Sequence, residues 1–83
     1  MKNWQEKDDQ LRATFEFKNF TTAFAFMTEV AFAAEKLNHH PDWSNVYNIV
    51  EFKLNTHDAG NRVTEKDHQL AAAIDNIYKK YPS

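Results

Sequence analysis

Three of the four histidines in this chain lie where apolar patterns of the sequence end. His39 and His40 are adjacent and precede Pro41, and His57 follows a segment of alternating apolar residues. Loops at the ends of rigid elements commonly carry functional residues. Imidazole titrates near neutral pH, so these side chains can donate or accept a proton under physiological conditions. The sequence therefore makes His39, His40 and His57 candidates for general acid–base chemistry.

The same three histidines also have a structural interpretation. A histidine before a helix-ending proline can simply cap the helix, and a histidine after a strand is often a surface residue. The C-terminal end of a helix also favours the protonated imidazole, which would bias His39 or His40 toward the role of acid. The residues alone leave the catalytic and the structural interpretation open.

Other catalytic or metal-binding arrangements lack support in the sequence. The chain has no cysteine, which excludes disulfides, thiolate metal ligands and a cysteine nucleophile. Adjacent His39 and His40 point in different directions, so they seldom bind one ion together. One glycine cannot build a glycine-rich phosphate loop, and no Ser/His/Asp set is legible in order or spacing. We therefore expect no metal site.

The composition describes a small globular protein. The 83 residues fit one domain, 1–83, and 42% hydrophobic with 27% charged residues excludes disordered and collagen-like classes. A net charge of −2 provides no basic surface for nucleic acid, and no apolar run approaches the ~20 residues of a membrane span. The first ten residues, MKNWQEKDDQ, contain no apolar signal-peptide core. We expect a reducing, cytoplasmic setting.

The apolar periodicity predicts strands and helices that hold the histidines at their ends. In chain order the expected elements are a short strand over 3–7, a strand over 11–17, a helix from Asn19 to about Leu37, a strand over 46–54 that a break near Asn48 would divide, and a helix that begins at a Thr64–Asp67 capping box. Helices that cover one face of a sheet form a two-layer α+β sandwich. We therefore expect an antiparallel sheet of three to four strands, in the order β-β-α-β(β)-α, with both main helices on one face.

The long expected helix has an unusually wide apolar face. With about 100° per residue, one arc holds the apolar residues Phe20, Ala23, Phe24, Phe26, Met27, Val30, Ala31, Ala34 and Leu37. Phe32 falls outside this arc, and is either an accidental exposed aromatic or part of a second contact surface. A chain this short buries only about 60–65% of its unfolded surface, so self-association is expected.

The residues around the histidines resemble the signature of the pterin-4a-carbinolamine dehydratases. The matching spaced positions are Glu35, His39-His40-Pro41, Tyr47, His57 and Asp67. The 14-residue block EKLNHHPDWSNVYN also resembles the family, as do FEFKNFTTAFAFMTEVAF before it and THDAG after it. The resemblance covers about residues 4–80, nearly the whole chain.

The resemblance implies a dehydratase that uses neither a metal nor an organic cofactor. Members of this family convert 4a-hydroxytetrahydropterin to quinonoid dihydropterin, which is then reduced and reused by aromatic amino acid hydroxylases. Loss of water requires one group to protonate the leaving hydroxyl and another to remove a proton from N5, and two imidazoles suffice. By this resemblance His39 and His57 are the acid–base pair, and His40 holds the pterin. The implied substrate contacts are Asn38, His39, His40, Asn55, Thr56, His57 and Asp58.

Three further residues have both a supporting and a structural interpretation. Glu35 either orients a histidine or is solvated on the helix. Trp43 either flanks the pterin ring or, as we favour, seals the edge of the core. Asp67 orients His57, bonds the helix cap, or does both. Tyr47 is expected to contribute to packing.

The resemblance also implies partners. Family members form homo-oligomers, dimers or tetramers, which agrees with the short chain and its excess apolar surface. Some animal members also act as dimerisation cofactors of a homeodomain transcription factor through the long helix. A protein-binding module without catalysis is therefore the alternative function, and the histidine cluster separates the two because an adaptor does not need it. Direct contact with nucleic acid or a membrane is not expected.

Overall fold

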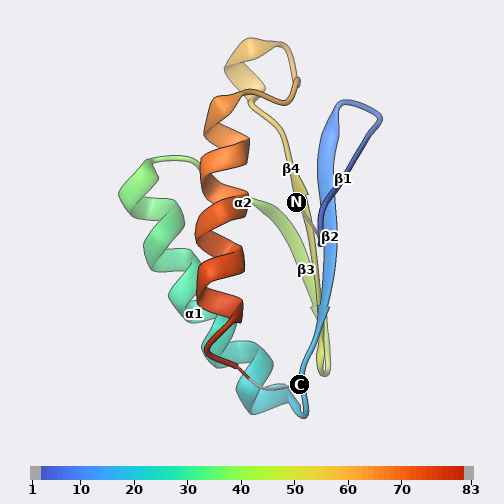
Figure 1. Ribbon diagram of the computed structural model, residues 1–83, viewed down its shortest axis with the longest axis vertical. Helices are drawn as coiled ribbons and strands as arrows, with labels where there is room; N and C mark the ends of the chain where they lie inside the picture. The colour runs from blue at the N-terminus through green and yellow to red at the C-terminus, as the bar shows by residue number, and fades with distance from the viewer. Residues whose placement is uncertain (1–2, 82–83) are drawn as a thin grey trace.

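A four-stranded antiparallel sheet forms one layer of the molecule, and two helices pack on one of its faces (Figure 1). This computed structural model describes residues 3–81. The elements are β1 (Gln5–Lys7), β2 (Gln10–Glu16), α1 (Phe20–Leu37), β3 (Asp42–Val46), β4 (Ile49–Leu54), the single 3₁₀ turn η1 (His57–Ala59) and α2 (Glu65–Tyr78). In space the strands follow the order β1-β2-β4-β3. The expected two-layer α+β sandwich is confirmed.

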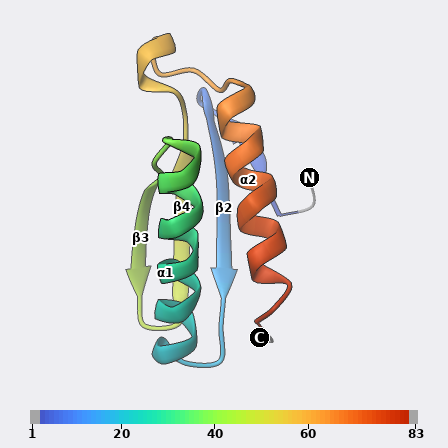
Figure 2. The same cartoon turned by 90° about the vertical axis from the view of Figure 1, so that its left-hand side faces the viewer.

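Period-two alternation decides which face of the sheet the helices cover. The central strands β2 and β4 are antiparallel, and their buried apolar residues pair as Leu11 with Leu54, Ala13 with Phe52, and Phe15 with Val50. The intervening residues Arg12, Thr14, Glu51 and Lys53 point to the opposite face. Figure 2 shows α1 over β4 and α2 on the β2 side of the same face. Within residues 3–81 the other face of the sheet carries no helix, and its side chains are mostly polar, with Val46 and Ile49 as apolar exceptions near the β3–β4 turn.

The break expected near Asn48 is present, and it divides segment 46–54 between two strands, the first of which begins earlier than expected, at Asp42. Val46 pairs with Ile49, so Tyr47 and Asn48 form a two-residue hairpin turn between β3 and β4. Tyr47 has a φ of +51°, which non-glycine residues seldom adopt, and its side chain is 62% exposed instead of packed. The Asn45 side-chain amide donates to the carbonyls of Tyr47 (3.1 Å) and Ile49 (2.9 Å) and thereby holds the turn.

Helix α1 begins and ends where the sequence predicts. The Asn19 side chain caps its start by accepting from the Thr22 backbone N–H at 2.8 Å. The helix buries only part of its apolar arc: Ala23, Phe26, Val30 and Ala34 are buried. Phe20 and Phe24, which belong to the same arc, are 47% and 56% exposed, and Phe32 is 72% exposed. The apolar surface of α1 is therefore wider than the sheet and α2 can cover.

The core lies between the sheet and the two helices and is dominated by aromatic rings. Phe26 of α1 lies 5.6 Å from Phe15 and 4.8 Å from Phe17, measured between ring centroids. Helix α2 adds the buried residues Leu70 and Ile74 from its apolar stripe. Its predicted capping box, formed by Thr64 and Asp67, is also confirmed. This packing fixes the ends of α1, β4 and α2 relative to one another.

A polar contact joins the middle of α1 to the C-terminal end of α2. The Glu29 carboxylate accepts hydrogen bonds from the Lys80 ammonium and the Tyr81 hydroxyl. The Lys80 hydrogen bond, followed by that of Tyr81, lowers the pKa of Glu29. The hydrogen bond to Glu29 in turn raises the pKa of Tyr81. Because its pKa is lowered on folding, Glu29 contributes stability above the ordinary pKa of glutamate and loses it as the pH falls.

We predict that Glu29→Gln lowers the thermal unfolding midpoint at pH 7 and that this difference shrinks as the pH falls through the lowered pKa of Glu29. Thermal unfolding followed by circular dichroism at several pH values measures the effect. The matched control is Glu51→Gln on the open face of the sheet. A Glu29→Gln deficit that grows on acidification would contradict the predicted sign.

Candidate active site

The three histidines at element ends meet at one end of the molecule. There the C-terminal end of α1, the segment after β4 and the start of α2 lie side by side (Figure 1). They enclose a pocket of about 320 Å³, near the lower end of the size range of small-molecule sites. Its lining residues are Asn38, His39, His40, Asn55, Thr56, His57, Asp58 and Lys66. All seven substrate contacts implied by the resemblance thus line one pocket.

The two histidines that follow α1 lie in different environments. Asn38 adopts the left-handed conformation (φ 52°, ψ 43°), which asparagine tolerates better than most residues. Its backbone N–H and that of His39 close the helix end by bonding to carbonyls of the last turn. After this turn the His39 side chain is only 11% exposed, whereas that of His40 is 60% exposed.

His57 comes from a short loop that closes on itself. A bridge between Thr56 and Arg62 ties the two ends of the loop, and Gly60 provides the positive φ (80°) that ends η1. His57 Nδ1 lies 3.1 Å from Oδ1 of Asn61. Because an amide oxygen only accepts, Nδ1 carries the proton and the neutral ring keeps Nε2 as its acceptor.

Asp67 contacts His39 and not His57, so the expected contact with His57 is wrong. Its Oδ1 lies 2.6 Å from His39 Nε2, while its Oδ2 accepts from the Thr56 hydroxyl and the Thr64 backbone N–H, both at 2.8 Å. The carboxyl group is fully buried. The N-terminal end of α2 lies against the end of α1, which places Asp67 beside His39. The cap interaction with Thr64 is present as expected.

Of the two remaining supporting residues, Glu35 contacts a histidine of the pocket and Trp43 does not. Glu35 Oε1 lies 2.8 Å from His40 Nε2, so it contacts a histidine, although both side chains are exposed. Trp43 packs against Phe52 in a tilted arrangement with ring centroids 5.6 Å apart, and it does not line the histidine pocket. This agrees with a core-edge role for Trp43. Sequence reasoning missed Lys66, a cation on the pocket wall whose only signal is its place beside Asp67 in the first turn of a predicted helix.

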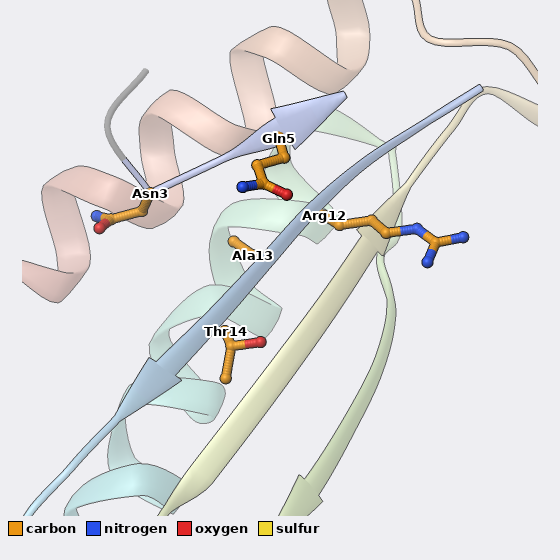
Figure 3. Close-up of a pocket in the computed structure, with 5 residues that line it drawn as sticks. All are labelled: Asn3, Gln5, Arg12, Ala13 and Thr14. Atoms are coloured by element: carbon orange, nitrogen blue, oxygen red, sulfur yellow. The ribbon is translucent and has the colours of Figure 1, made fainter. Parts of the chain in front are cut away.

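Two other hollows lie on the open side of the sheet. One, of about 300 Å³, is formed by residues from the start of the chain and from β1 and β2: Asn3, Gln5, Arg12, Ala13 and Thr14 (Figure 3). It contains neither a histidine nor a carboxylate. The other is lined by Trp43 and the polar side chains of β2, β3 and β4. Neither hollow offers an imidazole, so the histidine pocket is the candidate active site.

The two walls of the pocket carry groups whose chemistry includes proton exchange. His39, backed by a carboxylate, and His57, with one ring nitrogen available, come from segments separated in the sequence but face one polar hollow. Among residues 3–81, no three His, Asp or Glu side chains form a group suited to a metal ion. In the same range, neither helix has the length and hydropathy to cross a bilayer.

Comparison with known proteins identifies relatives over most of the chain. The sequence profile described as pterin 4 alpha carbinolamine dehydratase matches residues 1–77. A provisionally named pterin-4-alpha-carbinolamine dehydratase of Prochlorococcus marinus (strain MIT 9215) is 52% identical over 75 residues, covering 90% of this chain and 77% of its own. A relative of the same name from Rhizobium meliloti (strain 1021) is 54% identical over 77 residues, covering 90% and 73%.

Two solved structures share the fold. The transcriptional coactivator/pterin dehydratase from Brucella melitensis is 45% identical, with a TM-score of 0.85 over 90% of this chain and 81% of its own. A pterin dehydratase-like protein, described as a RuBisCO assembly factor in the alpha-carboxysome, has a TM-score of 0.73 over 89% and 84% of the two chains. At 23% identity, this second likeness shows the fold alone.

We predict that Asp67→Ala lowers the free energy of unfolding by about 1–3 kcal/mol, because buried donors that now bond to the carboxylate lose their acceptor. Urea unfolding of the variant and the wild type measures the difference. Asp58→Ala, at an exposed position of the same pocket, is the control and is expected to change stability by less than about 0.5 kcal/mol. Equal effects of the two substitutions would contradict the prediction.

Proposed function

The chain belongs to the pterin-4-alpha-carbinolamine dehydratase family, and on that premise we propose that it dehydrates 4a-hydroxytetrahydropterin to quinonoid dihydropterin by histidine acid–base catalysis. Such an enzyme is a hydro-lyase. One observation carries the proposed mechanism: imidazoles from two distant segments line a single small pocket, and one of them is hydrogen-bonded to a buried carboxylate.

The reaction needs two proton transfers, one to the 4a hydroxyl as it leaves and one from N5. The C4a–O bond breaks as the hydroxyl takes up a proton and departs as water, and N5 loses its proton as the N5–C4a double bond forms. One positioned acid and one positioned base are therefore sufficient. The proton that leaves N5 balances the proton gained by the hydroxyl, so no oxidant or reductant takes part.

We assign the two transfers to His39 and His57. The Asp67 carboxylate lies 2.6 Å from His39 Nε2 and orients the ring, which suits a group that exchanges protons with a bound substrate. His57 is hydrogen-bonded through Nδ1, which leaves Nε2 to exchange a proton with the substrate. Which of the two acts as the acid depends on the ring face that carries the hydroxyl.

The other residues of the pocket are proposed to hold the ring. His40 is exposed at the rim, and its contact with Glu35 supports a proposed role in binding the pterin. Asn38, Asn55 and Asp58 line the same pocket and offer amide and carboxylate groups that match the polar edge of a pterin. No metal or organic cofactor enters the proposed reaction.

The family premise also suggests a cellular role. We propose that the product is reduced and reused in tetrahydropterin recycling, linked to an aromatic amino acid hydroxylase. The cysteine-free composition suits the reducing cytoplasm.

We predict that His39→Ala and His57→Ala each lower the turnover of 4a-hydroxytetrahydropterin by about 10²-fold or more, and that the double variant loses more. Stopped-flow absorbance measures dehydration, and circular dichroism verifies the fold. His68→Ala, an exposed histidine outside the pocket, is the matched control and should retain wild-type turnover. Wild-type dehydration by a folded double variant would refute the assignment.

A second function, protein binding, is favoured by the outer surface of α1. Phe20, Phe24 and Phe32 are 47–72% exposed on this helix, far more apolar surface than a monomer needs to show. We propose that this surface joins copies of the chain into a dimer or tetramer. We propose self-association alongside catalysis and not in place of it, because a binding module without activity would not need the histidine pocket.

We predict that Phe32→Glu raises the dissociation constant of the oligomer by about tenfold or more, because a charge would be buried in an apolar contact. Light scattering and sedimentation at micromolar concentrations measure the mass. Ala72→Glu, at an exposed position of α2, is the control with the same added charge. A wild-type monomer at these concentrations would remove the proposal.

A further inference from the structure

Thr56 lines the histidine pocket, but its polar groups are engaged inside the protein. The residue is 8% exposed. Its backbone N–H donates to the Arg62 carbonyl at 2.8 Å, and its carbonyl accepts from the N–H groups of Ala59 and Asn61, both at 3.1 Å. Its hydroxyl lies 2.8 Å from Asp67 Oδ2 and 2.5 Å from the Thr64 hydroxyl. This arrangement favours a role inside the protein over the substrate contact that the family resemblance implies.

The proton positions in this cluster follow from the chemistry of its groups. Each hydroxyl has one proton, and a carboxylate only accepts. Thr56 donates its proton to Asp67, so the proton between the two hydroxyls comes from Thr64. The Thr64 backbone N–H also donates to Asp67 Oδ2. Two donors thus occupy Oδ2, which leaves Oδ1 to face His39.

The Asp67 carboxylate also determines the tautomer of His39, because it can only accept a hydrogen bond. With Asp67 ionised, Oδ1 accepts from Nε2 of His39 across 2.6 Å, so Nε2 carries the proton. The neutral ring then has Nδ1 as its acceptor. Buried hydrogen-bonded chains of this kind polarise their members and hold one arrangement.

We propose that Thr56 is a positioning residue: its hydroxyl holds the Asp67 carboxylate so that His39 keeps its proton on Nε2 and exchanges protons with the substrate through Nδ1. The catalytic part of this inference rests on the proposed function of His39. The tautomer part does not, and can be tested without substrate.

The test compares Thr56→Val, which keeps the shape but removes the hydroxyl, with Thr56→Ser, which keeps the hydroxyl. Nitrogen-15 NMR of the labelled imidazoles reads the protonated nitrogen of His39, and steady-state dehydration gives kcat and KM. Thr14→Val, on the open face of the sheet, controls for the substitution itself. Urea unfolding verifies that each variant is folded.

We expect wild-type His39 to carry its proton on Nε2 and Thr56→Val to shift it toward a mixture of tautomers. We expect Thr56→Val to lower kcat about tenfold, as losing one buried hydrogen bond would, with little change in KM. Thr56→Ser should restore most of the loss, and Thr14→Val should behave as the wild type.

Three results would overturn the proposal. They are a wild-type His39 protonated on Nδ1, a folded Thr56→Val with unchanged kcat and unchanged imidazole spectrum, and a Thr56→Val that raises KM alone, as a substrate contact would. If Thr56→Val does not fold, the wild-type spectrum and the spectrum of Thr64→Ala test the proposal instead. Thr64→Ala is expected to shift the His39 spectrum in the same direction as Thr56→Val. A wild type without dehydratase activity would refute the proposed function, while the spectra would still test the positioning by Thr56.

Discussion

A single buried carboxylate, that of Asp67, determines how the three segments of the pocket meet. A charge without solvent is costly unless hydrogen-bond donors surround it. Here the donors come from His39 after α1, from Thr56 in the segment after β4 and from Thr64 at the cap of α2. Because each segment supplies one donor, displacing any of them would leave the charge undersatisfied. The hydrogen bonds to Asp67 therefore determine both the geometry of the site and the way the helix ends pack together.

The fold supports this arrangement by placing the chemistry on the ends of rigid elements. The aromatic core between the sheet and the helices fixes where α1 and β4 end, and the loop after β4 is closed by its own backbone bonds. The pocket consequently needs little ordering when a ligand binds. By contrast, the two hollows on the open side of the sheet contain no imidazole.

Local patterns allowed much of the fold to be predicted, while long-range contacts did not follow from them. The Asn19 cap and the Thr64–Asp67 capping box are neighbours in sequence, so short motifs reveal them. The break near Asn48 could be anticipated, but the start of β3 at Asp42 and the positive φ of Tyr47 could not, because a tyrosine seldom occupies that conformation. The resemblance indicated the pocket residues, but the partner of Asp67 depends on how α2 packs against α1, across 28 positions of the chain.

The left-handed turn at Asn38 has a consequence for how this segment tolerates change. Two consecutive imidazoles leave it with opposite access to water, one sheltered and one at the rim. That difference depends on backbone register and not on side-chain identity alone. Inserting or deleting a single residue between the helix end and Pro41 would rotate the pair and exchange their surroundings. Length is therefore more tightly constrained here than composition.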